Sequence, residues 1–305
     1  MTPTSFVRRG LAPVMGLALA LTLAACGHST QVTSGADYLA RYAQSQTPPV
    51  QTTSGAQTSA GSEAGDKARL DAEVRAAASV EPTLTFPARL GIARVRHGLL
   101  APVQPGEGEA WTGLAERLGP EWGEIVPISP LIAAMASTPQ TTPQAGAGSV
   151  QGLAVQAPRC HADYRDCLRK TMRDIRLGAA RQHLDAVIVY EAFARSEITS
   201  NPIAVTKLAL IGFFLPSEDV AAEGFAHAVL IDVRNGYTYG MAAAETEKPE
   251  VAITTSSNEY QVARRLNLQA EAKAVQALGT EVEAMLRDLR LALAEKRAAE
   301  AAVPK

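Results

Sequence analysis

Residues 224–244 read GFAHAVLIDVRNGYTYGMAAA, and this stretch decides the fold class. Two runs of alternating residues flank Asn235-Gly236, a dipeptide typical of a two-residue type I′ turn in a β-hairpin. Such a turn would pair Asp232 with Tyr239. The face that carries the tyrosines is expected to be the wetter one. The opposite face has small residues across from β-branched ones, so we expect it to pack against helices.

Helical and strand periodicities alternate on both sides of this hairpin. Apolar residues recur at spacings of three and four within 257–299, which predicts a long C-terminal helix with a core-facing or coiled-coil stripe. A capping-box pattern at Thr280–Glu283 after Gly279 predicts a break or bend in that helix. The other predicted helices span 66–79, 106–118 and 163–183, with a short one opening at Ser129, and the predicted strands span 89–96, 124–128, 186–190 and 203–215. Together they predict one α/β domain over 66–305: an α/β (α+β) sandwich whose mixed, largely antiparallel sheet is flanked by helices.

The first 25 residues have the pattern of a signal peptide. Arg8 and Arg9 precede an apolar run that is too short to span a membrane, which takes about 20 apolar residues. The run ends at Leu23-Ala24-Ala25-Cys26, which resembles the lipobox of bacterial lipoproteins. The resemblance implies cleavage before Cys26 and lipidation of its thiol.

Lipidation would fix the location of the protein. A lipoprotein with Gly27 after the cysteine, and not Asp, is expected in the periplasmic leaflet of the outer membrane, or on the outer face of the cytoplasmic membrane if the cell has only one. Residues 26–65 are rich in Ser, Thr, Gln, Gly, Ala and Pro, so we predict a disordered tether there. Forty residues of such chain have a mean reach of about 35 Å.

Charge and composition exclude several classes of partner. The chain has 29 Lys and Arg against 31 Asp and Glu, and loss of Arg8 and Arg9 with the signal leaves 27 against 31. Such a balance gives no overall basic field for nucleic acid. Aromatic residues make up 5% of the chain, which argues against a stacking platform for sugars or bases.

Two cysteines remain once Cys26 is assigned to the lipid. Cys160 and Cys167 form an even pair in an oxidising compartment, which favours a disulfide. On one regular helix their Cα atoms would lie about 10 Å apart, too far for a bridge, so we expect Cys160 to precede the helix. The alternative is a metal site that uses Cys160, His161 and Cys167, but it lacks a clear fourth ligand.

One segment carries a family resemblance. Residues 176–189 read RLGAARQHLDAVIV, an alanine-rich helix followed by a buried strand. This junction resembles the amino-terminal domain of TolB, the curli-secretion-channel lipoproteins and the penicillin-binding-protein activator lipoproteins. The resemblance covers about residues 85–245 and implies an α/β sandwich. The membrane-crossing hairpins of a curli-type channel are not evident, because 203–215 is continuously apolar.

No motif for catalysis stands out. The chain has no phosphate-binding glycine loop, no GxSxG, no HExxH and no paired CxxC. His183, Asp185 and Glu191 are imaginable as a catalytic cluster, but a helix-terminal histidine and two surface or capping acids explain them more simply. We therefore expect no catalytic, cofactor or metal site, and a non-enzymatic envelope lipoprotein that docks on or regulates another envelope component. Alternatives are an oligomeric secretion-channel lipoprotein, with the C-terminal helix as a candidate contact, and a periplasmic hydrolase or metal-binding protein.

Overall fold

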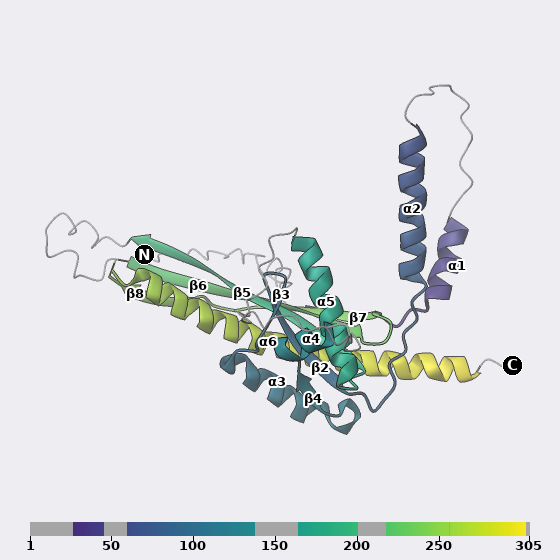
Figure 1. The fold of residues 1–305 in the computed structure, drawn as a ribbon. Helices are drawn as coiled ribbons and strands as arrows, with labels where there is room; N and C mark the ends of the chain where they lie inside the picture. The colour runs from purple at the N-terminus through teal and green to yellow at the C-terminus, as the bar shows by residue number, and fades with distance from the viewer. Residues whose placement is uncertain (1–26, 46–59, 138–163, 201–217, 256, 303–305) are drawn as a thin grey trace, which may run out of the picture.

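The computed structural model of the chain describes residues 27–45, 60–137, 164–200, 218–255 and 257–302. Within these residues, eight strands form one sheet, accompanied by six α-helices and a short 3-10 helix (Figure 1). The strands are β1 (Gly27–Thr30), β2 (Leu90–Arg96), β3 (Leu99–Ala101), β4 (Ile125–Pro127), β5 (Ala186–Ser200), β6 (Glu218–Asp232), β7 (Thr238–Glu245) and β8 (Glu250–Thr254). The helices are α1 (Gly35–Ser45), α2 (Ala60–Ala78), α3 (Pro105–Leu118), η1 (Pro120–Trp122), α4 (Pro130–Ser137), α5 (Tyr164–Arg181) and α6 (Glu259–Ala302).

The predicted fold class is confirmed. The sheet is mixed and largely antiparallel, and the last element of the described chain is a long helix, α6. Its strands follow the order β1-β7-β6-β5-β2-β3, with β4 paired to β2 and β8 paired to β6. β2 runs parallel to β4 and β5, and the remaining neighbours are antiparallel.

The two central strands are longer than the sequence predicts. β5 and β6 pair over their full length, from Ala186 opposite Asp232 to Ser200 opposite Glu218. Figure 1 shows their far ends extending beyond the other strands except β8, alongside the first turns of α6. The strand predicted over 186–190 is therefore only the fully buried beginning of β5. The far half of β5 is partly buried or exposed, and its last four residues are all exposed.

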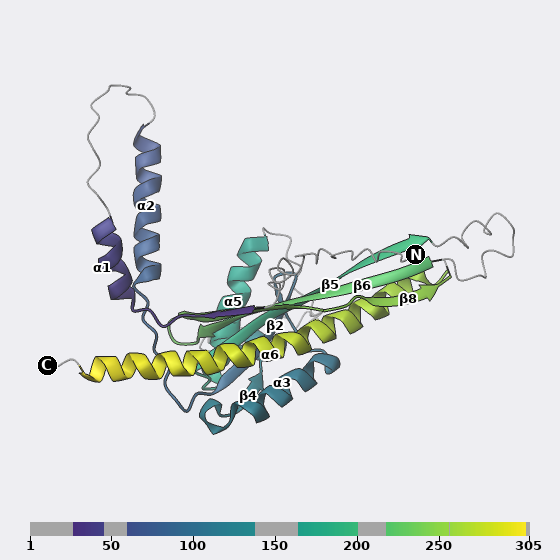
Figure 2. The same cartoon turned by 180° about the vertical axis from the view of Figure 1, so that it is seen from behind.

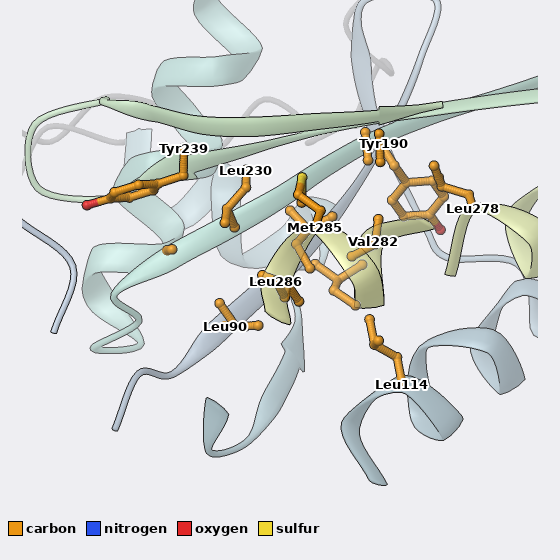
Figure 3. Close-up of a cluster of buried hydrophobic side chains, with 14 of the residues drawn as sticks. Leu90, Leu114, Tyr190, Leu230, Tyr239, Leu278, Val282, Met285 and Leu286 are labelled. Atoms are coloured by element: carbon orange, nitrogen blue, oxygen red, sulfur yellow. The ribbon is translucent and has the colours of Figure 1, made fainter. Parts of the chain in front are cut away.

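Helix α6 packs lengthwise on one face of the sheet. Its apolar stripe, including Leu278, Val282 and Met285, meets the sheet on one side and Leu114 of α3 on the other (Figure 3). The stripe is therefore used in core packing and gives no support to an oligomer contact through this helix. α6 is continuous through Gly279, so the predicted break there is wrong; burial on both sides of this position holds the helix together.

A glycine allows α6 to approach the sheet closely. A Cβ atom at Gly224 of β6 would overlap the backbone carbonyl of Ala270, and it would lie 3.2 Å from the Cβ of Ala274. The small residues Ala242 and Ala244 of β7 face α6, but the β-branched Ile231 and Val233, which were expected on the same side, pack on the opposite face.

The described residues cover the opposite face of the sheet only in part. Ile175 and Ala179 of α5 pack there against Val187 and Ile231, forming a second core cluster. Figure 2 shows α5 on one side of the sheet and α3 on the other. The Ser129 hydroxyl accepts a hydrogen bond from the backbone N–H of Ile132 (3.2 Å) and so caps α4, the short helix that was predicted to open at Ser129.

The central hairpin has a different register from the predicted one. Leu230 pairs with Gly240, and an irregularity follows between Leu230 and Ile231. Such an irregularity re-aims the side chains that follow it. Tyr239 is consequently fully buried on the α6 side, whereas Met241 is 55% exposed on the other face. The prediction of a wetter tyrosine face is wrong.

Buried hydrogen bonds satisfy the Tyr239 hydroxyl. It donates to Oδ2 of Asp232 (2.7 Å) and accepts from the backbone N–H groups of Thr83 (2.9 Å) and Leu84 (2.7 Å). Oδ1 of Asp232 accepts from the N–H of Arg234 (2.8 Å), which shapes the loop ahead of β7. Burial, followed by the Asp232 carboxylate, raises the pKa of Tyr239, so this tyrosine stays neutral and structural.

The N-terminal region also differs from the prediction. Gly27–Thr30 is a strand of the sheet and Gly35–Ser45 is a helix, so a disordered tether over 26–65 is wrong for these residues. A polar segment can join a sheet edge because the pairing is supplied by backbone groups and needs no apolar side chains of its own. Helices α1 and α2 lie side by side and project away from the sheet (Figures 1 and 2).

Several predictions lie outside the described residues. They are the signal peptide over 1–25, Cys26, Cys160, His161 and the strand over 203–215. Among the helices that the structure describes, none combines the length and the apolar character that a membrane crossing requires.

Candidate functional site

The residues that directly follow Cys26 form the candidate site. β1 begins at Gly27, pairs antiparallel with β7 and forms one edge of the sheet. Gly27 lies opposite Ala243, and Thr30 lies opposite Gly240. The predicted acylation position is thus a single residue away from an ordered strand.

His28 connects β1 to helix α6 through side-chain hydrogen bonds. Its Nε2 lies 2.9 Å from Oδ2 of Asp288, and its Nδ1 lies 3.3 Å from Oε2 of Glu281. Glu281 and Asp288 are seven positions apart, which places them two turns apart on one face of the helix. The imidazole can donate to both carboxylates at once only when it is protonated.

These carboxylates shift the protonation equilibrium of His28. The hydrogen bond to Asp288 has the largest effect and raises the pKa above the ordinary value of 6.5. Partial burial opposes the rise, and the hydrogen bond to Glu281 adds to it. The charged form is therefore favoured, and it connects the N-terminal strand to the longest helix.

Further contacts hold the chain between β1 and α1. The Gln31 N–H donates to the Tyr239 carbonyl (2.8 Å), and the Tyr237 hydroxyl donates to the Thr33 carbonyl (3.1 Å). Oε1 of Glu81 accepts from the Ser34 hydroxyl (2.9 Å) and from the Ala36 N–H (3.0 Å) at the start of α1. The backbone hydrogen bond from Ala36 is the largest cause of a lowered pKa at Glu81. Attachment thus continues from Gly27 into the first helix.

A second polar cluster lies inside the core between the sheet, α3 and α6. Arg94 of β2 is 1% exposed; its Nε lies 3.0 Å from Oε1 of Glu107, and its Nη2 donates to Oε2 of Glu271 at 3.0 Å. Oε2 of Glu107 accepts from the Tyr190 hydroxyl (2.8 Å), and Oε1 of Glu271 accepts from Arg96 (3.4 Å). Two arginines balance two carboxylates in this cluster.

This cluster has a structural role. Burial and then the negative charge of Glu107 raise the pKa of Tyr190, so its hydroxyl stays protonated and donates. Glu107 also accepts from the Gln104 N–H (3.1 Å) and so completes the capping box of α3. The Trp111 ring packs on the Tyr190 ring, with ring centroids 4.9 Å apart. These contacts tie α3 and α6 to β2 and β5.

The imagined cluster of His183, Asp185 and Glu191 is not assembled. The Asp185 carboxylate accepts from the Arg89 N–H (2.9 Å) and from Nη2 of Arg234 (2.9 Å). Glu191 instead lies 3.8 Å from Nε2 of His227, on the neighbouring strand. His183 sits just past α5 with φ of 56° and is exposed. Capping and surface roles therefore account for these residues.

Of the three cysteines, only Cys167 lies in the described residues. Cys167 lies in the first turns of α5, is buried and is disulfide-bonded. Its partner lies outside the described residues, so the pairing with Cys160 stays a prediction. In the part of the chain that the structure describes, no three His, Cys, Asp or Glu side chains are grouped to hold a metal ion.

Sequence reasoning missed β1 and both polar clusters. Residues 27–30 are four small or polar residues without apolar alternation, so no local pattern indicates a strand. Arg94 and Glu271 are 177 residues apart, and nothing local pairs them. The one available signal was Arg94 at an inward position of the strand predicted over 89–96, which required a buried acidic partner.

No family model and no curated protein matches this chain. The resemblance of residues 176–189 to the TolB, curli-channel and activator lipoproteins therefore stays a prediction.

Proposed function

We propose that the protein is a non-enzymatic, lipid-anchored envelope protein whose body is held close to the membrane surface, where it docks on or regulates an envelope component. The observation that carries this proposal is the start of β1 at Gly27, directly after the lipobox cysteine. The lipobox supplies the anchor, and the strand supplies a firm connection between the anchor and the body.

The position of β1 changes what the anchor does. A forty-residue flexible tether would let the body move about 35 Å from the lipid. With β1 docked, one residue of at most about 3.6 Å separates Cys26 from Gly27 on the sheet edge. The body would then keep one orientation toward the membrane, which suits docking on a partner at a fixed height.

The sheet face opposite α6 supports a docking role. Phe193 of β5 and Phe225 of β6 stack there with ring centroids 5.4 Å apart, and Phe193 is 48% exposed. Met241 of β7 and Ile253 of β8 are also exposed, at separate positions opposite Val229 and Asp219 of β6. The stacked aromatic pair supports a contact surface, because aromatic side chains are enriched in the cores of protein interfaces.

Cell fractionation tests the anchor. The wild-type protein should enter the membrane fraction and carry diacylglyceryl and acyl groups on an N-terminal Cys26, as measured by intact-protein mass spectrometry. The Cys26→Ser variant should be released into the soluble fraction. A matched Ser29→Ala variant, which keeps the lipobox, should stay in the membrane. A wild-type protein without lipid, or a Cys26→Ser variant that stays in the membrane, would contradict the proposal.

A second candidate function is self-assembly, as in a secretion-channel lipoprotein. Among the described strands, none pairs with the outer edge of β5 over Ala192–Ser200 or with the outer edge of β8. Both strands run antiparallel to β6 and so parallel to each other, and a head-to-tail contact between these edges would continue the sheet from one copy to the next. Light scattering on the purified Cys26→Ser protein decides this, since a monomer at micromolar concentration argues against assembly.

A further inference from the structure

A pocket of about 530 Å³ lies where the C-terminal half of α5 meets the start of β5 and the loop between β6 and β7. This volume falls in the range of small-molecule sites. It is lined by Arg173, Arg176, Leu177, Ala180, His183, Leu184, Asp185, Val233 and Arg234.

Positive charge is in excess in this pocket. Three arginines line it against one carboxylate, that of Asp185. This carboxylate is already engaged, because it accepts from Arg234 (2.9 Å) and from the Arg89 backbone (2.9 Å). Arg173 is exposed and has no carboxylate partner among the described residues. The pocket thus has a positive balance in a chain whose overall charge is negative.

Arg176 is held in place without being neutralised. Its Nη2 donates to the carbonyl oxygens of Val233 (3.1 Å) and Arg234 (3.2 Å), which are dipoles and carry no full charge. The loop admits this guanidinium because residue 236 is glycine: a Cβ there would lie 3.0 Å from Nη1 of Arg176, and the residue has φ of 80°. Arg176 is therefore a fixed cation at the wall of the pocket.

One feature of the fold opposes an anion here, and an arginine offsets it. The C-terminus of α5 presents carbonyl groups with partial negative charge. Nη1 of Arg89 donates to the carbonyl of Gln182 at 3.0 Å and so covers part of that charge. The guanidinium groups of the pocket then dominate its field.

We propose that this pocket binds a phosphate group, either as free phosphate or phosphate ester or as the headgroup of an anionic phospholipid. Guanidinium groups match the oxygens of phosphate with paired, charge-assisted hydrogen bonds. Arg173 offers its charge to the ligand, because no described carboxylate pairs with it, and Arg176 is positioned by the loop that carries Arg234. The pocket is built by the folded body alone, so the inference does not rest on lipidation of Cys26.

Titration calorimetry on the mature Cys26→Ser chain, which has no lipid of its own, tests this inference. Inorganic phosphate and pyrophosphate are the soluble probes. Vesicles of phosphatidylglycerol in phosphatidylcholine, against phosphatidylcholine alone, are the membrane probe. Arg173→Gln should weaken binding by about tenfold or more, because it removes one charge-assisted contact. The matched control is Arg169→Gln, one turn earlier on α5, where Arg169 pairs with Asp166 outside the pocket.

Each outcome bears on the proposal. Binding of the soluble probes that Arg173→Gln weakens and Arg169→Gln preserves supports a site for free phosphate compounds. The same pattern with anionic vesicles alone supports a headgroup site. Equal loss of affinity in both variants shows a general charge effect and overturns the proposed phosphate site. Binding that Arg173→Gln leaves unchanged overturns it too. Absence of binding to every probe overturns it as well.

Discussion

His28 Nε2 lies 2.9 Å from Oδ2 of Asp288, which is 260 residues further along the chain. This contact joins the strand that follows the predicted lipidation site to the helix that closes the core. Because Glu281 lies on the other side of the ring, a single imidazolium connects two turns of α6 to the sheet edge. The attachment of the N-terminus is thereby made sensitive to protonation.

We predict that β1 is held more firmly at acidic pH. The pKa of His28 is raised above its ordinary value of 6.5, so protonation stabilises the folded state. This stabilisation is complete below 6.5 and is lost as the pH rises through the raised pKa. Hydrogen exchange of residues 27–33, corrected for intrinsic rates, should show weaker protection at about pH 8 than at about pH 6. His28→Ala should remove the difference, and equal protection of the wild type at both pH values would contradict the prediction.

The close approach of α6 to β6 predicts a sharp effect at Gly224. A methyl group at this position overlaps the Ala270 carbonyl, so Gly224→Ala should lower the free energy of unfolding by about 1–3 kcal/mol. The control is Gly108→Ala in α3, where a Cβ meets nothing within 4 Å. That change should stabilise the protein by about 0.5–1 kcal/mol. Urea unfolding measures both variants, and an unchanged midpoint for Gly224→Ala would show that the helix can move away.

The buried ion cluster predicts unequal losses at its two arginines. Arg94→Ala leaves the carboxylates of Glu107 and Glu271 buried with their main partner removed, and should cost about 3–5 kcal/mol. Arg96 is 42% exposed at its side chain and solvent screens its contact with Glu271, so Arg96→Ala should cost about 1 kcal/mol or less. Chemical denaturation of both variants is the measurement. Similar small losses would mean that water reaches the cluster.

The predicted Cys160–Cys167 bridge is testable by mass spectrometry. In the Cys26→Ser protein, alkylation without reductant should leave both remaining cysteines unmodified, and digestion should release them in one linked peptide. Because the loop is short, Cys160→Ser should lower the free energy of unfolding by about 2 kcal/mol. Free thiols in the native protein would contradict the bridge.

The sequence by itself determined the elements whose side chains repeat with a clear period. The apolar stripe of α6, the alternation in β2 and the paired runs around Asn235-Gly236 each indicate a helix, a strand or a hairpin, because helices and strands repeat with different periods. The predicted lipobox at Cys26 likewise rests on a local pattern. These patterns were sufficient for the α/β class and for the long C-terminal helix.

Only the tertiary structure decided the partners of those elements. β1 is a strand because β7 offers it backbone groups, and Tyr239 is buried because an irregularity in the β6–β7 ladder turns it toward α6. His28 and Arg94 acquire their roles from carboxylates on α6 that lie far away in the chain. Edge pairing, strand register and buried ion pairs depend on which surfaces meet after folding, and a local pattern carries no information about that meeting.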